Sequence, residues 1–400
     1  MPQGSNHSSS TVARFAITLL ALVCGGLLAT PFSALAQKPP GPAAKAKPAA
    51  QRPIVLAQVV PLSGPLAAVG RDVSDATQAY VDLLNRAGGI GGRTVELVIA
   101  DDGNDPKRST AATLDLINKH EPVAFVNCFG TVGCLAQVDA LRASGTPMIG
   151  PIAGAPSLRT REQRHVFSIR PDAASEVRVL AEHLRSIGSP PITVVYQDDG
   201  FGRSYLPFAE RVLQDYGLAI ERVVRIVPEK PDYTGAAKSV GTGSKALLLL
   251  ANVTHSVGVL RALSAVGVEP LAFNLAAQAN ADFINRMTGV WTYSVFATFT
   301  PSPWRRALAS AREYQGAWRT ITPDRPFSYL SFEAYLNARV LGEALTRAGR
   351  TVTAERLMTA LETMPPLELD GLVVNFGIGR RQGASYVDLA VLSSRGQFRQ

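Results

Sequence analysis

Residues 54–106 read IVLAQVVPLSGPLAAVGRDVSDATQAYVDLLNRAGGIGGRTVELVIADDGNDP, and this stretch decides the fold. Residues 54–60 form a short apolar run rich in β-branched side chains, as is typical of a strand buried on both faces. A helical period follows over 67–87 and ends at two glycines, and 93–100 reads as a second strand. A strand, a crossover helix and a parallel strand form a βαβ unit. Such units build open parallel sheets, which bind ligands beyond the carboxyl ends of their strands.

Short apolar runs and amphipathic stretches keep alternating along the chain. Strands are expected at 124–128, 147–150, 193–196, 220–227, 246–250 and 271–274, and helices at 135–144, 205–216, 256–266 and 329–348. Strands that alternate with helices predict an α/β fold, with parallel sheets covered by helices on both faces. Most of the 400 residues follow this pattern. A chain of that length exceeds what one core usually holds, so two domains are expected.

The N-terminal segment has the pattern of an export signal. Arg14 precedes an apolar run over 15–29, and residues 34–36 (ALA) form a small-x-small cleavage site, so residues 1–36 are predicted to be a signal peptide cleaved after Ala36. The alternative is an uncleaved membrane anchor, but the apolar run is short for a span and two glycines interrupt it. Residues 37–53 are rich in Pro, Ala and Lys, which predicts an extended, disordered linker.

Composition and motifs argue against several functions. The formal charge of +8 comes from Lys and Arg scattered along the chain, without a basic run that interleaves aromatics, so no nucleic-acid partner is expected. The glycines at 88–92 precede a strand, whereas a dinucleotide fingerprint follows one. The chain has no G-x-S-x-G elbow and only five His, none at ligand spacing. We therefore expect a protein that is not an enzyme and has no catalytic residues, metal or cofactor.

Several motifs, taken in order, resemble one family. They are PLSGPLAAVG at 61–70, DDGNDP at 101–106, FGTVG at 129–133, GPIAGAPSLR at 150–159 and YQDDGFGRS at 196–204. Their order and spacing are similar to those of the leucine/isoleucine/valine-binding type of periplasmic substrate-binding proteins, which serve ABC importers. The resemblance covers roughly residue 54 to the C-terminus.

The resemblance implies a type I periplasmic binding protein. That fold has two doubly wound parallel-sheet lobes joined by a three-strand hinge. Lobe one would comprise 54–171 plus 300–376, and lobe two 172–299 plus 377–400. The implied function is capture of a small polar organic ligand, such as an amino-acid derivative, a carboxylate or an amide, by hinge closure. A monomer in the periplasm would then deliver the ligand to the membrane permease of an ABC importer.

The loop at 129–133 is the best candidate site. It follows a strand and opens a helix, so unpaired backbone N–H groups and the positive end of a helix dipole converge there. This setting suits a carboxylate, to which Thr131 adds a hydroxyl donor. A simple helix cap by Thr131 is the alternative. The resemblance gives the same ligand role to this loop, including Phe129 and Gly130.

Other candidate residues are expected at the neighbouring strand ends. Ser63 places a hydroxyl at the carboxyl end of the first strand, and Ala153 and Gly154 lack bulk and so let a ligand approach the backbone. The resemblance implies that Phe201 covers the ligand from lobe two and that Asn252 aligns with a further contact. The adjacent Asp198 and Asp199 are expected to cap a helix instead.

The ammonium group of an amino acid lacks an evident partner in this sequence. Relatives use a Glu near the position of Ala276, and no acidic residue stands in 272–281, although Gln278 could form a hydrogen bond. A buried ammonium without a counter-charge is costly. A carboxylate-bearing or amide-bearing ligand without a free ammonium therefore fits the remaining groups better.

Two cysteines flank the candidate loop. Cys24 lies in the predicted signal peptide, so the exported chain keeps Cys128 and Cys134, which form either one disulfide or two buried thiols. Relatives often bridge this region to a Cys in the DDGNDP turn, but Asn104 stands there in this chain.

Three other functions compete with importer-linked capture. The same fold could sense a ligand for a separate chemoreceptor or sensor kinase, it could act as a scavenger without a transporter, or the chain could be an exported enzyme.

Overall fold

Strand β1 (Ile54–Val60), the apolar run that opens the pattern, lies inside a five-stranded sheet in the computed structural model, which describes residues 52–290, 293–393 and 395–400. The predicted signal peptide and nearly all of the linker lie outside the described residues. The strand order is β2-β1-β3-β4-β5 and all neighbours are parallel. The other strands are β2 (Val95–Asp101), β3 (Ala124–Val126), β4 (Met148–Ile149) and β5 (Val166–Phe167).

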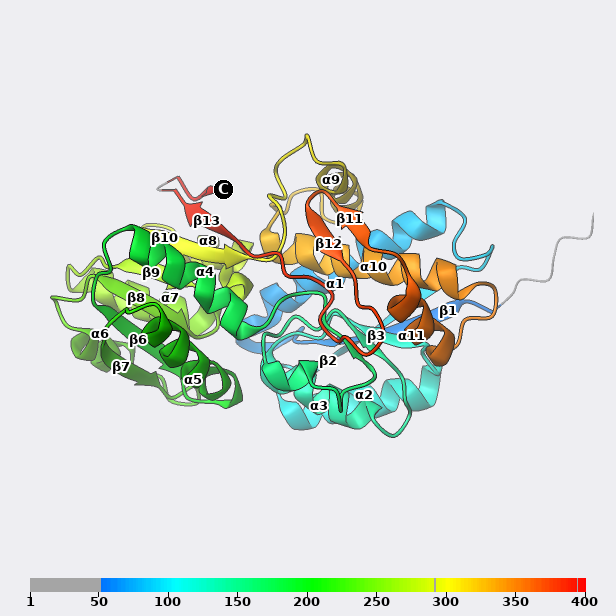
Figure 1. Cartoon of the computed structure of the whole chain (residues 1–400), viewed down its shortest axis with the longest axis horizontal. Helices are drawn as coiled ribbons and strands as arrows, with labels where there is room; N and C mark the ends of the chain where they lie inside the picture. Colours follow the sequence, from blue (N-terminus) through cyan, green and yellow to red (C-terminus); the bar gives the residue numbers. More distant parts are fainter. Residues whose placement is uncertain (1–51, 291–292, 394) are drawn as a thin grey trace, which may run out of the picture. The chain divides into compact units, whose positions relative to one another are not determined.

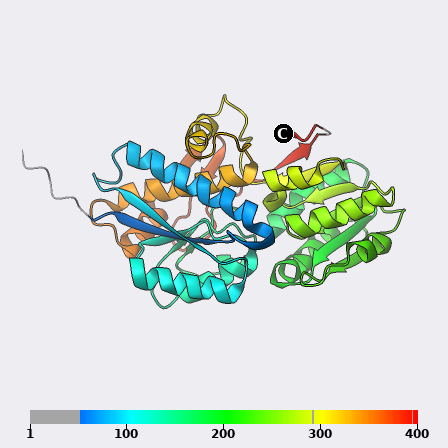
Figure 2. The same cartoon turned by 180° about the vertical axis from the view of Figure 1, so that it is seen from behind.

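Helices cover both faces of this first sheet. Helices α1 (Ala67–Arg86) and α10 (Tyr329–Ala348) lie on one face, and α2 (Pro106–His120) and α3 (Thr131–Leu141) lie on the other (Figures 1 and 2). Alternate residues of β1 join different cores, because successive side chains of a strand point to opposite faces. Leu56 belongs to the core with α1 and α10, whereas Ala57 belongs to the core with α2 and α3.

A second, seven-stranded sheet has the order β14-β13-β10-β9-β8-β6-β7. Its strands are β6 (Ile192–Gln197), β7 (Ile220–Ile226), β8 (Ala246–Leu250), β9 (Leu271–Asn274), β10 (Ser294–Thr298), β13 (Asp388–Leu392) and β14 (Phe398–Arg399). The first five are parallel to one another, but β13 joins antiparallel to β10 and β14 antiparallel to β13, at one edge of the sheet. The second sheet is therefore mixed at that edge, which the sequence pattern does not predict.

Helices also cover both faces of the second sheet. Alternate residues of β8 separate the two faces: Leu248 packs with α4 (Ala173–Ser186) and α5 (Gly200–Asp215), and Leu249 packs with the core that contains α7 (Val253–Ala265). The remaining helices and strands are α6 (Tyr233–Val240), α8 (Ala281–Met287), α9 (Ala309–Ile321), α11 (Ala354–Thr363), and the hairpin β11 (Leu367–Leu369) and β12 (Leu372–Val374). Three short 3₁₀ turns, η1 (Gly64–Leu66), η2 (Pro156–Arg159) and η3 (Ala276–Gln278), complete the fold.

The chain passes between the two sheets three times. The first crossing follows β5, the second follows β10, and the third precedes β13. Backbone bonds tie the first crossing to the third: Ser168 N–H donates to Arg381 O at 2.9 Å, and Gly383 N–H donates to Ser168 O at 2.8 Å. The guanidinium of Arg170 lies over the ring of Phe299 at 4.4 Å, which links the first crossing to the second. The predicted lobe boundaries stay a prediction.

Candidate functional site

One cavity is lined by residues that follow strand ends in both sheets. Thr131 follows β3 and Ala153 follows β4 of the first sheet, while Phe201 follows β6 and Asn252 follows β8 of the second. This is the carboxyl edge at which open α/β sheets bind ligands. Seven of the nine predicted ligand-binding residues line the cavity: Phe129, Gly130, Thr131, Ala153, Gly154, Phe201 and Asn252.

The N-terminal end of α3 borders this cavity without a side-chain cap. Its N-cap is Gly130, at φ 78°, so the alternative in which Thr131 caps the helix is not what the structure has. Thr131 is 2% exposed, and its hydroxyl has no hydrogen-bond partner among the described residues. An unpaired buried hydroxyl is costly, and first-turn N–H groups lack partners within their helix. A ligand oxygen would satisfy these groups.

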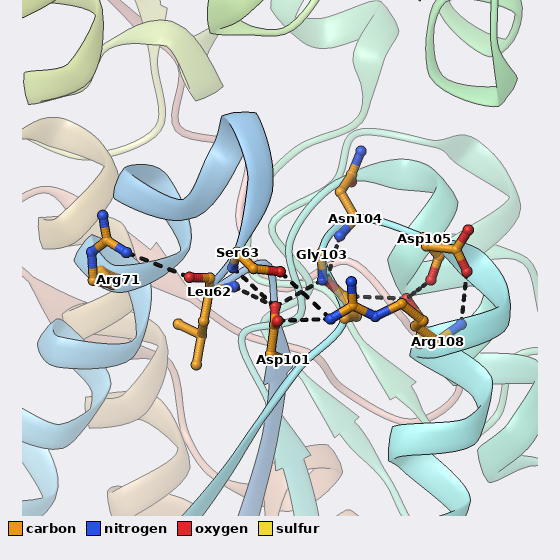
Figure 3. Close-up of polar contacts among 10 residues, drawn as sticks. Leu62, Ser63, Arg71, Asp101, Gly103, Asn104, Asp105 and Arg108 are labelled. Atoms are coloured by element: carbon orange, nitrogen blue, oxygen red, sulfur yellow. Dashed lines mark hydrogen bonds and ion pairs between the residues drawn. The ribbon is translucent and has the colours of Figure 1, made fainter. Parts of the chain in front are cut away.

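Ser63 does not line the cavity, because its hydroxyl belongs to a different cluster. Figure 3 shows Ser63 pointing toward Asp101 and Arg108, which form an ion pair at 2.7 Å. Burial opposes ionisation of Asp101, but hydrogen bonds from the Ser63 hydroxyl and from three backbone N–H groups hold its pKa well below the usual range. The side chain of Asn104 points away from this cluster and lines the cavity, a contact that the sequence did not predict.

Gln278 is also placed away from the cavity lining. It is 1% exposed in η3, and its amide donates to Ala251 O at 2.5 Å and to the Ser256 hydroxyl at 3.1 Å. The side chain therefore braces the turn between β8 and α7 behind the cavity.

An acidic side chain does stand next to the 272–281 segment, but it comes from another element. Glu176 on α4 lines the cavity, is 1% exposed, and accepts from Ala276 N–H at 2.5 Å and from the Tyr205 hydroxyl at 3.4 Å. Burial raises the pKa of Glu176 to about 7. An ammonium group in the cavity would therefore have an acidic side chain within the lining, although residues 272–281 supply none. Glu176 lies on the same apolar stripe of α4 as Ala173, Val177 and Leu180, a helical spacing that could have marked it as buried.

Two arginines lie beside the cavity with different partners. Arg170 lines it and forms a bidentate pair with Glu333 of α10, with both N–O distances 2.7 Å. Arg159 forms no ion pair within the described part of the chain, and its guanidinium donates to four backbone carbonyls. The acceptors are Ala153 O, Ala155 O, Arg170 O and Pro171 O, at 2.9 to 3.2 Å. Burial lowers the pKa of Arg159 to about 10, which leaves it charged at neutral pH.

Tyr205 of α5 packs against Gly154, in the loop that follows β4 of the first sheet. A Cβ atom at position 154 would overlap the Tyr205 hydroxyl, so any residue larger than glycine would have to displace Tyr205. The Tyr205 ring also lies 4.8 Å from the ring of Phe201, centroid to centroid, one helical turn earlier. The absence of a side chain at Gly154 thus makes room for the Tyr205 hydroxyl, and it also leaves the backbone at this position open toward the cavity.

Polar caps on the second sheet also reach the cavity. Asp199 caps α5 as predicted, accepting from Phe201 N–H and Gly202 N–H, and it lines the cavity together with Gln197. Asn252 caps α7 through His255 N–H, while its own N–H donates to the Gln197 side chain at 2.9 Å. Asp198 instead forms ion pairs with two exposed arginines. Helix capping and cavity lining are thus combined in Asp199 and Asn252.

The two cysteines are joined. Cys128 and Cys134 form a disulfide with a Cα–Cα distance of 5.4 Å, so the bridge, and not a pair of thiols, closes the 129–133 loop.

Within residues 52–290, 293–393 and 395–400, no cluster of three His, Cys, Asp or Glu side chains could hold a metal ion. None of the helices in these ranges combines the length and the apolar character that a membrane span requires.

Known proteins resemble this chain over most of its length. A family model described as "Periplasmic binding protein" matches residues 53–396. The "Leu/Ile/Val-binding protein homolog 3" of Brucella melitensis is 23% identical over 328 residues, which cover 80% of this chain and 86% of that protein.

Two solved structures are similar in fold and sequence. A substrate-binding periplasmic protein from Ralstonia solanacearum is 27% identical, with a TM-score of 0.78, and the match covers 87% of this chain and 99% of that one. An extracellular ligand-binding receptor from Verminephrobacter eiseniae is 25% identical, with a TM-score of 0.79, over 87% and 100% of the two chains. The chain therefore belongs to the periplasmic binding proteins, in the leucine/isoleucine/valine-binding type, a family of substrate-binding proteins.

Proposed function

We propose that this protein captures a small ligand that carries both a carboxylate and a nitrogen donor, such as an amino acid or its derivative, for delivery to an ABC importer. The observation that carries the proposal is the pairing of two unlike polar groups in one cavity. One is the uncapped end of α3 with the unpaired Thr131 hydroxyl, and the other is the buried carboxyl of Glu176.

Each end suits one part of such a ligand. A helix N-terminus with free N–H groups favours an anion, so the ligand carboxylate would meet Gly130 and Thr131. A carboxylate offers about four acceptor positions, and the bonds from Ala276 N–H and the Tyr205 hydroxyl leave some of those of Glu176 for a ligand N–H group or ammonium. The apolar side chains of Phe129, Ile152 and Phe201 would contact the ligand between these ends.

Capture would proceed by closure of two lobes, 54–171 plus 300–376 and 172–299 plus 377–400. The ligand would first meet the first-sheet side, and closure would then bring Phe201, Tyr205 and Glu176 onto it. A ligand shifts such an equilibrium only by its difference in affinity for the two states, so the contacts added on closure set the affinity. We further propose export by a signal peptide cleaved after Ala36, action as a monomer and a membrane permease as the partner.

The experiment measures separately how much the carboxylate and the ammonium of the ligand contribute to binding. Binding of leucine, of 4-methylpentanoate, which lacks the ammonium, and of leucinamide, which lacks the carboxylate, is measured by calorimetry and thermal unfolding. A ligand at about 100 times its dissociation constant adds about 2.7 kcal/mol of stability. Thr131→Val should weaken binding of leucine and 4-methylpentanoate about ten- to a hundredfold, and leucinamide much less, because it removes a hydrogen bond to a charged group.

Glu176→Gln tests the other end. It should weaken leucine and leucinamide but not 4-methylpentanoate. Thr359→Val, an exposed threonine on α11, is the matched control and should change nothing. If both site variants bind all three compounds as tightly as the wild-type protein does, the proposed ligand class is wrong. If the wild-type protein binds none of the three compounds, the capture of such ligands is contradicted.

A further inference from the structure

The Cys128–Cys134 disulfide encloses the loop that borders the cavity. Cys128 lies two residues beyond β3, and Cys134 lies in the first turn of α3. Of the five residues between them, the four at 129–132 line the cavity. The bridge thus ties the strand end to the helix start on either side of the cavity-lining residues.

Besides the bridge, few interactions with described residues fix this loop. Three backbone hydrogen bonds hold it: Gly130 N–H to Ile152 O, Ile152 N–H to Cys128 O, and Cys134 N–H to Gly130 O, at 2.9 to 3.1 Å. Asn127 and Gly130 both have positive φ, at 55° and 78°, a region that few residues adopt freely. Helix α3 has no side-chain cap at its N-terminus, whereas α5 and α7, on the other side of the cavity, are both capped.

The bridge is shielded from solvent. Both cysteines are fully buried, in an apolar cluster with Val138 and Leu141 of α3. A disulfide at this position is not open to attack by a dissolved thiol while the protein is folded, since exchange needs access to a sulfur atom. It therefore acts as a permanent link in the folded protein.

We propose that the Cys128–Cys134 bridge positions the ligand loop, so that the N–H groups of α3 and the Thr131 hydroxyl are already in place before a ligand arrives. The inference rests on the proposed function, because it takes this loop to meet the ligand. Holding a binding loop in its bound conformation lowers the entropy lost on binding. Ordering the backbone of a single residue at binding reduces affinity by about tenfold. Loss of the bridge should therefore weaken ligand binding.

Two bridge-free forms test the inference. One is the Cys128→Ala/Cys134→Ala variant, and the other is the wild-type protein unfolded and refolded in reductant. Hydrogen exchange of the amides of residues 129–134 is followed without ligand, and the dissociation constant for leucine is measured under conditions in which each form is fully folded. Both forms should exchange these amides about tenfold faster or more, with β1 and α10 unchanged, and should bind leucine about tenfold more weakly or worse.

A stability control separates positioning from general weakening. Thr353 caps α11 through Arg356 N–H, far in sequence from the cavity loop, and Thr353→Ala should lower stability by loss of a cap while leaving the leucine affinity unchanged. Unchanged exchange of the loop amides, or an affinity within twofold of the bridged protein, would overturn the inference. If the bridged protein binds none of the three test compounds, the proposed function fails, and the exchange rates still decide whether the bridge holds the loop.

Discussion

Replacing Glu176 with Gln should change how the stability of this protein depends on pH. Burial raises the pKa of this carboxyl from its ordinary value of 4.5 to about 7. Between these values the folded protein holds a proton that the unfolded chain has released. Stability rises with pH only where the unfolded state binds more protons, so here it falls as pH rises. The contribution of Glu176 is fully present below about pH 4.5 and is lost by about pH 7.

The size of the effect follows from this difference in pKa. One unit of pKa corresponds to about 1.4 kcal/mol, so the rise in the pKa of Glu176 makes the protein about 3 kcal/mol less stable above pH 7 than below pH 4. In the middle of the window the free energy of unfolding should fall by about 1.4 kcal/mol per pH unit on account of this one group. Glutamine does not titrate, keeps the shape of the side chain and can still accept from Ala276 N–H.

Urea unfolding at several pH values between 4.5 and 7.5 measures the slope directly. Asp72, whose pKa burial also raises to about 7, adds to the wild-type slope, so the test is the difference between the two proteins. Glu182→Gln, an exposed glutamate on the same helix, should behave as wild type. Equal slopes for Glu176→Gln and wild type would refute the reasoning, because they would mean that Glu176 is ionised without cost in the folded state.

Three further outcomes are expected. Cys128→Ala/Cys134→Ala should lower the free energy of unfolding by about 2 kcal/mol in denaturant titrations, because so short a loop restricts the unfolded chain only modestly. Gly154→Ala should abolish the measured binding, since its methyl group displaces the Tyr205 ring, and adding Tyr205→Ala should restore part of it; equal affinity of the single and double variants would contradict this. Asn127→Ala should cost about 2 to 3 kcal/mol in urea unfolding, because it removes two buried hydrogen bonds to α10 and one to Thr77; a loss below 0.5 kcal/mol would count against that role.

Strongly patterned elements of the fold were predictable to the residue. Strands β1, β8 and β9 and helix α10 begin and end where the sequence predicts, because each is a dense apolar run or a long periodic stretch. The starts of α3, α5 and α7 were predicted too late. Their first turns contain glycine or polar residues, such as Gly200 after the capping Asp199, and these carry no apolar period. The antiparallel edge of the second sheet depends on pairing between β10 and β13, which lie far apart in the sequence.

The site was predictable where position along a strand decides it. The loops after β3, β4, β6 and β8 border one cavity because parallel strands end at the same edge. The exceptions depend on tertiary partners. Asp101 and Arg108 engage the Ser63 hydroxyl, and Glu176 reaches Ala276 from a helix a hundred positions earlier in the chain. No local pattern indicates either contact, although the buried stripe of α4 marks Glu176 as unusual.

Arg159 has a consequence for how dry the region around the cavity can be. Loops normally run over the surface because water satisfies their carbonyl groups. Here the guanidinium of Arg159 donates hydrogen bonds, in place of water, to four carbonyl groups. Two of them lie in the bend after β4 and two in the first crossing between the sheets. An irregular stretch of backbone can then run next to the cavity without solvent around it. Arg159 is in this sense a covalently attached substitute for several ordered water molecules, one that cannot exchange or leave when a ligand binds.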